Sequence, residues 1–311
     1  MEKFYFKKGS LVLKSCFLIA NIFYKFCIIF TLLPQGMSQY SEPIIVKVKK
    51  IKEALPYFDE ANQNTLVIFD IDSTLTTPSD PCLRRFSIKK HKDIFDRYVG
   101  QLTKKQLYIF THLLILQSPS QLVEKEFPKV IIRLQKRGVK TIACTASTTG
   151  NIGNIVKNFS LWRFHELKKL GIDFSSIFPG RSLFPYEGCD DDMPGIERGI
   201  VGCGHKVKKG MLFDKIVAHV NFTPNKVIVI DDKMENIESF MNEIKFRYPD
   251  VKFIGIQYDG MQLLSSIYAS KSEFEEKIKV LADRAVKICD QYQVHTPHPL
   301  SIKLDELKMA G

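Results

Sequence analysis

LVIFDIDSTL, residues 66–75, is the stretch that decides the fold of this 311-residue chain. Four apolar residues are followed by two carboxylates two positions apart, and then by hydroxyl side chains. A continuous apolar run of this kind is typical of a strand covered on both faces, as in a parallel α/β sheet. Ligands of such sheets bind in the crevice at the carboxyl ends of the strands. We therefore expect Asp70 and Asp72 to lie at a binding edge.

Strands and helices are expected to alternate along the rest of the chain. Further buried strands are predicted at 139–144, 226–230 and 252–257. The pattern changes to helical spacing between them, in segments at about 86–117, 130–138, 152–170, 209–220 and 261–292. This alternation predicts a mostly parallel sheet with right-handed crossovers, in the α/β class.

Two segments interrupt this alternation. Residues 76–120 begin with a turn signal and continue with helical periodicity, so we expect a small helical insert. Residues 172–208 are rich in glycine and proline and contain three consecutive aspartates, Asp190–Asp192. We interpret this second segment as a β-hairpin or flap, with the aspartates in an exposed turn.

The charge of the chain is basic, but it is not organised for nucleic acid. The formal net charge is +11, and residues 1–36 contribute five lysines against one glutamate. The remaining lysines are scattered, without a stripe of interleaved aromatic residues. We therefore expect small anionic or phosphorylated partners and no nucleic acid.

The first 40 residues have the order of an export segment. A basic start leads into apolar residues at about 10–34, which are interrupted by Lys14, Asn21 and Lys25. Lys25 alone costs a membrane span roughly 3 kcal/mol. Residues 1–40 are thus expected to be a signal peptide, or an anchor attaching the chain to a membrane through residues 10–34. The protein would then be periplasmic, secreted or membrane-anchored, and it would be cytoplasmic if translation starts at Met37.

The cysteines indicate neither a disulfide framework nor a zinc site. Seven are present, five of them beyond residue 40, and no CxxC pair occurs. In an exported protein Cys189 and Cys203 could bridge a hairpin. The alternative is that both are packed thiols.

Polar side chains follow three of the predicted strands. Asp70 and Asp72 follow the first, Thr145 the second, and Asp231 and Asp232 the third. Because the carboxyl ends of parallel strands share one edge, four carboxylates and a hydroxyl are expected in one crevice. Like charges so close together raise one another's pKa unless a cation lies among them. A hard divalent cation with oxygen ligands, Mg²⁺ above all, is therefore expected there.

Lys209 adds a positive charge to this predicted crevice, because it opens the helix at 209–220. Metal, ammonium and hydroxyl groups together match the charge of a phosphoryl group in transfer. An ionised aspartate is an adequate nucleophile for a covalent intermediate, and a second carboxyl nearby can move protons.

Over residues 60–260 the chain resembles the haloacid dehalogenase (HAD) superfamily of phosphohydrolases. FDIDSTL at 69–75 resembles the first motif of that family, which implies that Asp70 is the nucleophile and Asp72 the general acid/base. Thr145 resembles the phosphate-binding hydroxyl of the second motif, with Ser147 as a competitor. Lys209 resembles the lysine of the third motif, and Lys206 and Lys208 are rival registers.

The fourth motif of the superfamily resembles IVIDD at 228–232. The candidate metal ligands are therefore Asp70, Asp72, Asp231 and Asp232. The resemblance implies a HAD-type Rossmannoid three-layer α/β/α sandwich over residues 41–293, with a helical cap at 76–120, a flap at 172–208 and a tail at 294–311. The chain is also similar to an uncharacterised bacterial group of exported HAD-like proteins.

We therefore expect a Mg²⁺-dependent phosphatase that acts on a small phosphorylated substrate. An aspartyl-phosphate at Asp70 would be the intermediate. Two alternatives remain: a phosphotransferase resembling the phosphomutases of this superfamily, and a non-catalytic exported binding protein on the same scaffold.

Overall fold

The computed structural model describes residues 42–152, 155–189 and 192–291. The whole predicted export segment at 1–40, the tail at 294–311, and Asp190 and Asp191 lie outside these ranges. Within them, no helix is long and apolar enough to cross a membrane. Residues from Ser41 onward form one compact unit, which is the part described below.

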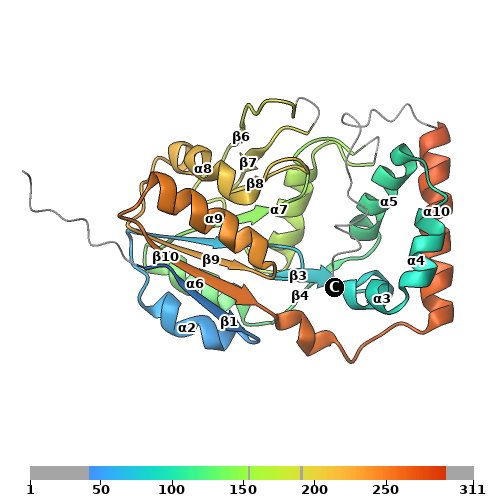
Figure 1. Cartoon of the computed structure of the whole chain (residues 1–311), viewed down its shortest axis with the longest axis horizontal. Helices are drawn as coiled ribbons and strands as arrows, with labels where there is room; N and C mark the ends of the chain where they lie inside the picture. The colour runs from blue at the N-terminus through green and yellow to red at the C-terminus, as the bar shows by residue number, and fades with distance from the viewer. Residues whose placement is uncertain (1–41, 153–154, 190–191, 292–311) are drawn as a thin grey trace, which may run out of the picture. The chain divides into compact units, whose positions relative to one another are not determined.

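A single large sheet organises the described residues (Figure 1). Its eight strands lie in the order β1-β10-β9-β2-β5-β8-β7-β6, and every pairing from β1 to β8 is parallel. The strands of this parallel part are β1 (Ile44–Val48), β2 (Thr65–Phe69), β5 (Lys140–Thr145), β8 (Ile200–Gly202), β9 (Lys226–Asp231) and β10 (Lys252–Tyr258). The predicted α/β class and mostly parallel sheet are therefore confirmed.

Helices cover both faces of the sheet, which gives a Rossmann-like three-layer sandwich. Val67 and Phe69 of β2 pack with α2 (Ile51–Asp59), α6 (Phe127–Lys136) and α7 (Phe159–Lys169). Leu66 and Ile68, which point to the opposite face, pack with α8 (Phe213–Val220) and α9 (Met234–Arg247). All five residues of β2 are buried. This is why the strand is apolar without alternation.

A helical lobe stands beside the carboxyl edge of the sheet. Residues 76–120 contribute η1 (Pro81–Leu83), α3 (Arg85–Lys90), α4 (Lys92–Val99) and α5 (Lys104–Leu116), between the paired short strands β3 (Thr76–Pro78) and β4 (Ser120–Leu122). The C-terminal helix α10 (Lys271–Gln291), which follows η3 (Gly260–Leu264), packs against α4 and α5 and shares one apolar core with them. The lobe thus combines an insert with a distant segment of the chain (Figure 1).

The turn-rich segment at 172–208, for which a β-hairpin or flap was expected, forms antiparallel strand pairs. It contains β6 (Arg181–Leu183) and β7 (Gly195–Glu197), which leads through a tight turn into β8. β8 pairs with β5, so this hairpin continues the main sheet and is not a separate flap. Gly199 forms the turn at φ 76°, and a Cβ there would lie 2.1 Å from the Phe174 carbonyl oxygen. Only glycine suits that position.

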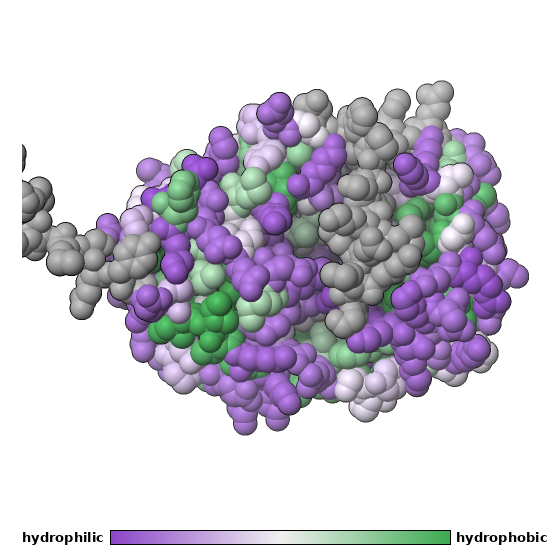
Figure 2. Space-filling view, viewed as in Figure 1, coloured by the Kyte–Doolittle hydropathy of each residue, from purple (hydrophilic) through white to green (hydrophobic). Residues whose placement is uncertain are grey.

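The surface seen in Figure 2 is mostly hydrophilic. An apolar area in this view lies toward the β1 edge of the sheet, where Ile44 and Ile45 are 37% and 39% exposed. The cysteines that the structure describes form no disulfide. The Sγ of Cys203 lies 3.5 Å from the Sγ of Cys144, and both side chains are buried, Cys144 in β5 and Cys203 directly after the neighbouring strand β8.

Candidate functional site

The ends of β2, β5 and β9 bring the predicted polar residues to one edge. β2 is hydrogen-bonded between β5 and β9, with Phe69 opposite both Ala143 and Ile230. The backbone N–H of Asp70 donates to the Ile230 carbonyl at 2.9 Å. Asp70 therefore follows the last paired residue of the central strand, beside the end of β9.

Lys209 joins two of the carboxylates in a buried ion-pair network. Its Nζ lies 2.6 Å from Oδ1 of Asp70 and 2.7 Å from Oδ2 of Asp231. The exposed fractions of these three residues are 2%, 6% and 1% respectively. Lys209 begins the short helix η2 (Lys209–Leu212), whose Gly210 donates its N–H to the Ser239 hydroxyl of α9.

Three aspartates gather at this point with more negative charge than Lys209 neutralises. One carboxylate oxygen from each of Asp70, Asp231 and Asp232 lies within 4.8 Å of the others. Burial, with the charge of Asp70, raises the pKa of Asp231 to about 6. Burial, with the charges of Asp70 and Asp231, raises the pKa of Asp232 to about 7. These shifts indicate a site that favours an additional cation.

The Lys209 ammonium remains charged in this environment. Burial lowers its pKa, but the carboxylates of Asp231 and Asp70 outweigh that effect and hold the pKa well above its ordinary value. Asp231 is further oriented by the backbone N–H of Lys233 and by the Asn236 amide, which both donate to its Oδ1 at 2.9 Å.

The donor set of this trio suits Mg²⁺. All of its side-chain ligands are carboxylate oxygens, which hard divalent cations prefer. Asp70, Asp231 and Asp232 are therefore the residues that would hold the ion.

Asp72 is not part of the trio, although the sequence predicted it as a fourth metal ligand. The chain turns at Ser73, whose φ is 70°, and the side chain of Asp72 instead meets Arg163 of α7. The two guanidinium contacts are both 3.1 Å long. The carboxylate therefore lies at the wall of the crevice, in a place suited to proton transfer to or from a bound group.

Thr145 lies between Asp72 and Ser147. Its hydroxyl is 3.4 Å from Oδ2 of Asp72 and 3.1 Å from the Ser147 hydroxyl. The two competitors for the phosphate-binding role are thus neighbours in one hydroxyl cluster. In contrast, the rival lysines Lys206 and Lys208 are exposed.

Arg163 and Arg85 were missed by the sequence analysis. Arg163 is 2% exposed and stacks against Phe159 and Trp162. Arg85, at the start of α3, forms an ion pair of 2.5 Å with Asp232. Neither arginine belongs to a local motif, because each meets its partner only through the fold. The available signal was a basic residue in the predicted insert at 76–120 and another in the helical segment predicted at 152–170.

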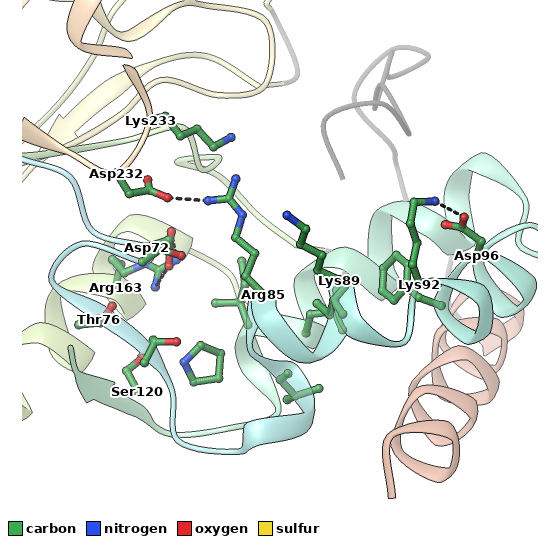
Figure 3. A pocket seen from close by; sticks show the side chains of 18 residues that line it. Asp72, Thr76, Arg85, Lys89, Lys92, Asp96, Ser120, Arg163, Asp232 and Lys233 are labelled. Carbon is green, nitrogen blue, oxygen red and sulfur yellow. Dashed lines mark hydrogen bonds and ion pairs between the residues drawn. The ribbon is translucent and has the colours of Figure 1, made fainter. Parts of the chain in front are cut away.

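A cavity of about 530 Å³ opens beside these groups, between the sheet edge and the helical lobe (Figure 3). Asp72, Asp232 and Arg163 line its sheet side, and Arg85, Lys89 and Lys92 line its lobe side. The volume lies within the range of about 300–1,000 Å³ that is typical of small-molecule sites.

Comparisons with known proteins place the whole of this site within one family. A family model described as "Protein of unknown function (DUF2608)" matches residues 47–286. An uncharacterized protein of Rickettsia prowazekii (strain Madrid E) is 26% identical over 236 residues, which are 74% of this chain and 81% of the relative. An uncharacterized protein of Rickettsia felis is 28% identical over 166 residues, or 51% of this chain and 56% of the relative. Because the family model covers most of the chain, the protein belongs to the DUF2608 family.

Proposed function

We propose that this protein is a Mg²⁺-dependent phosphate monoester hydrolase of the HAD type, acting on a small phosphorylated molecule. The observation that carries the proposal is the buried cluster of Asp70, Lys209, Asp231 and Asp232 at the carboxyl edge of the parallel sheet. Its residues occupy the positions that resemble the superfamily's motifs. The adjoining cavity supplies room for a substrate.

The groups around Asp70 suit a phosphoryl group. Mg²⁺, when bound, would supply positive charge that stabilises the charge on a transferring phosphoryl group. Lys209 adds a buried ammonium 2.6 Å from Asp70, and the hydroxyls of Thr145 and Ser147 offer hydrogen-bond donors on the other side. Fixed charges of this kind in a site that excludes water are worth more than in solution.

The proposed reaction has two displacement steps. In the first, an oxygen of Asp70 bonds to phosphorus, the P–O bond of the ester breaks, and the leaving oxygen takes the electron pair and a proton from Asp72. In the second, water attacks the phosphorus of the aspartyl-phosphate while Asp72 takes a proton from that water. The acyl P–O bond then breaks, which releases phosphate and restores the Asp70 carboxylate.

Asp72 lies two residues after Asp70 in the chain, and its side chain is accessible, as the proposed acid/base role requires. Its side chain is 44% exposed, whereas that of Arg163 beside it is 3% exposed. Arg163 therefore orients the carboxylate from the protein side and leaves its other side open to the cavity (Figure 3).

The test is release of inorganic phosphate from 4-nitrophenyl phosphate by the full chain in the presence of Mg²⁺. We expect turnover that EDTA abolishes and that added Mg²⁺ restores. Asp70→Asn should lower kcat by at least about 10³-fold, since it removes the nucleophile.

Asp93→Asn is the matched control. Asp93 is an exposed aspartate of α4 that is 3.9 Å from Lys271 and does not line the cavity. This variant should retain wild-type turnover. Absence of phosphate release across a broad panel of phosphate esters would contradict the proposed function, and undiminished turnover by Asp70→Asn would contradict the assigned nucleophile.

A further inference from the structure

The cavity beside the acidic trio has an excess of positive side chains. Its described lining contains five basic residues and three aspartates (Figure 3). The basic ones are Arg85, Lys89, Lys92, Arg163 and Lys233. The partners of these cations decide which of them are available to a bound anion.

Three of the cations have a carboxylate partner within the lining. Arg163 pairs with Asp72, Arg85 with Asp232, and Lys92 with Asp96. The Lys89 side chain has neither a hydrogen bond nor an ion pair to any residue in the described part of the chain. Among the described residues, the Lys233 ammonium reaches only Glu235, an exposed residue, at 3.8 Å.

The two cations without a cavity partner are drawn on either side of Arg85, with Lys89 on α3 and Lys233 on the chain that follows Asp232 (Figure 3). The Lys89 amino group is directed from α3 toward the part of the cavity where Arg85 and Lys233 lie (Figure 3). Arg85 shares its partner Asp232 with the candidate metal site. A metal ion bound to Asp232 would weaken the ion pair between Asp232 and Arg85. Arg85 would then be a third cation available to a ligand in the same part of the cavity.

The uncharged lining includes four hydroxyl side chains, Ser73, Thr76, Thr77 and Ser120, and an apolar wall that belongs mainly to the helical lobe. The apolar residues are Pro78, Leu83, Ile88, Phe95, Leu114 and Ile115. Such a wall suits the carbon body of a ligand, and a few polar groups then fix its orientation.

We propose that the substrate is a phosphate monoester whose leaving group carries a second anionic group on an apolar body. The scissile phosphate lies at Asp70 and the second anion lies against Lys89 and Lys233, with Arg85 beside them. This inference rests on the proposed function for the identity of the first anion. It adds the chemical class of the leaving group, which the acidic trio alone does not define.

The experiment compares 4-carboxyphenyl phosphate with 4-carbamoylphenyl phosphate, which are nearly identical in shape and differ in charge. For wild type with Mg²⁺ we expect kcat/KM to be about tenfold higher for the carboxylate. Lys89→Gln and Lys233→Gln should each reduce that ratio severalfold, and the double variant should bring it close to one. A ratio near one in wild type, with both esters hydrolysed, overturns the inference and leaves the proposed function standing.

Lys90→Gln is the matched control. Lys90 is the next residue of α3, but its ammonium lies over the Tyr268 ring and it does not line the cavity. The ratio of kcat/KM for the carboxyl ester to that for the carbamoyl ester should be the same in Lys90→Gln as in wild type. If Lys90→Gln and Lys89→Gln reduced this ratio equally, the preference would come from the net charge of the protein, and the proposed binding of the second anion at Lys89 would be overturned.

A second anion can be a carboxylate or another phosphate, and 1,4-phenylene bisphosphate separates these cases. A higher kcat/KM for the carboxyl ester or for the bisphosphate than for the carbamoyl ester supports the inference. The ester with the larger kcat/KM relative to the carbamoyl ester identifies the preferred second anion.

A binding measurement decides the inference even if no ester is hydrolysed. Calorimetric titration of wild type with 4-carboxybenzylphosphonate and 4-carbamoylbenzylphosphonate, both resistant to hydrolysis, should show about tenfold tighter binding of the former. Lys89→Gln should remove the difference. Equal affinities in wild type overturn the inference irrespective of catalysis.

Discussion

The carboxylate of Asp72 is held by both terminal nitrogens of Arg163, with Nη1 to Oδ1 and Nη2 to Oδ2 contacts of 3.1 Å each. This two-point contact fixes the plane of the Asp72 carboxylate, and it comes from a helix that begins almost 90 residues later in the chain. Arg163 is therefore a positioning residue for the proposed acid/base group.

Arg163→Lys should lower kcat for an aryl phosphate by about tenfold or more and change the pH profile of kcat, because lysine retains the charge but not the two-point geometry. Mg²⁺ affinity should not change, since Asp72 is outside the acidic trio. Arg198→Lys is the control, because Arg198 also stacks on a phenylalanine of α7 but is not among the cavity residues. Equal kcat and pH profiles in Arg163→Lys and wild type would exclude the positioning role.

Mg²⁺ should raise the melting temperature of the wild-type protein, since a ligand that binds only the folded state stabilises it by about 2.7 kcal/mol at 100 times Kd. Asp232→Asn removes a charged ligand from the trio and should abolish most of this rise. Asp214→Asn breaks another aspartate–arginine pair, with Arg247, and should keep the full rise. Thermal unfolding with and without Mg²⁺ measures both. A full Mg²⁺ response in Asp232→Asn would place the ion elsewhere.

Lys209→Met should lower the free energy of unfolding by about 3–5 kcal/mol at pH 7, because it leaves buried carboxylates without their cation. The loss should shrink as the pH falls toward 5, since Asp231, whose pKa is already raised to about 6, then becomes neutral by taking up a proton. Mg²⁺ should restore part of the loss. Lys208→Met, at the exposed neighbouring position, should have little effect on urea unfolding. A small loss in Lys209→Met would show that the pair contributes little.

Gly210→Ala should destabilise the protein by about 1–3 kcal/mol and also reduce activity, because a Cβ there would lie 2.1 Å from the Ser239 carbonyl oxygen of α9. The necessary shift moves η2, which carries Lys209. Gly180→Ala is the control, since its nearest neighbour would be an ordinary 3.7 Å away. Urea unfolding and phosphate release report the two effects, and wild-type values for Gly210→Ala would mean that η2 is free to move.

Stability should fall as the pH drops from about 6.5 to 4 through the protonation of His112. Burial lowers its pKa to about 4, and His205 and Arg163 add to this effect, while the Tyr108 carbonyl and Asp192 oppose it. Because its pKa in the unfolded chain is about 6.5, the unfolded state binds more protons in this range, and the loss at pH 5 is about 2 kcal/mol.

His112→Gln tests this assignment, since it should flatten the dependence of unfolding free energy on pH between 7 and 5. His219→Gln is the matched control: His219 makes the same contact to the carbonyl four residues earlier, but at an exposed position. Equal pH dependence of wild type and His112→Gln would exclude His112 as the source.

The local sequence predicted the elements that build the sheet. β2, β5, β9 and β10 occupy the predicted ranges to within one residue at most ends, because continuous apolar runs bounded by polar residues report burial on both faces. The same reasoning placed Asp70, Thr145 and Asp231 at one edge, since parallel strands share their carboxyl ends. Lys209 was placed at the same edge because it opens the helix predicted at 209–220, and its resemblance to a motif supported that position.

Other features depend on contacts between distant segments, which no local pattern records. The hairpin of β7 and β8 joins the main sheet because β8 pairs with β5, and a turn-rich sequence does not reveal such a partner. Likewise, the amphipathic pattern of α10 predicts a buried face, but only packing shows that this face covers the helical insert.

By itself, then, the sequence determined which strands end in polar side chains and what chemistry these side chains make available at the sheet edge. Both follow from residues that are close together in the chain. The tertiary structure decided how the groups are divided: Asp70, Asp231 and Asp232 around Lys209, and Asp72 against Arg163. The division depends on the turn at Ser73 and on where α7 packs, and both are set by the energy of the whole fold. The substrate cavity is likewise a product of packing, since its two walls come from the sheet edge and a separate helical lobe.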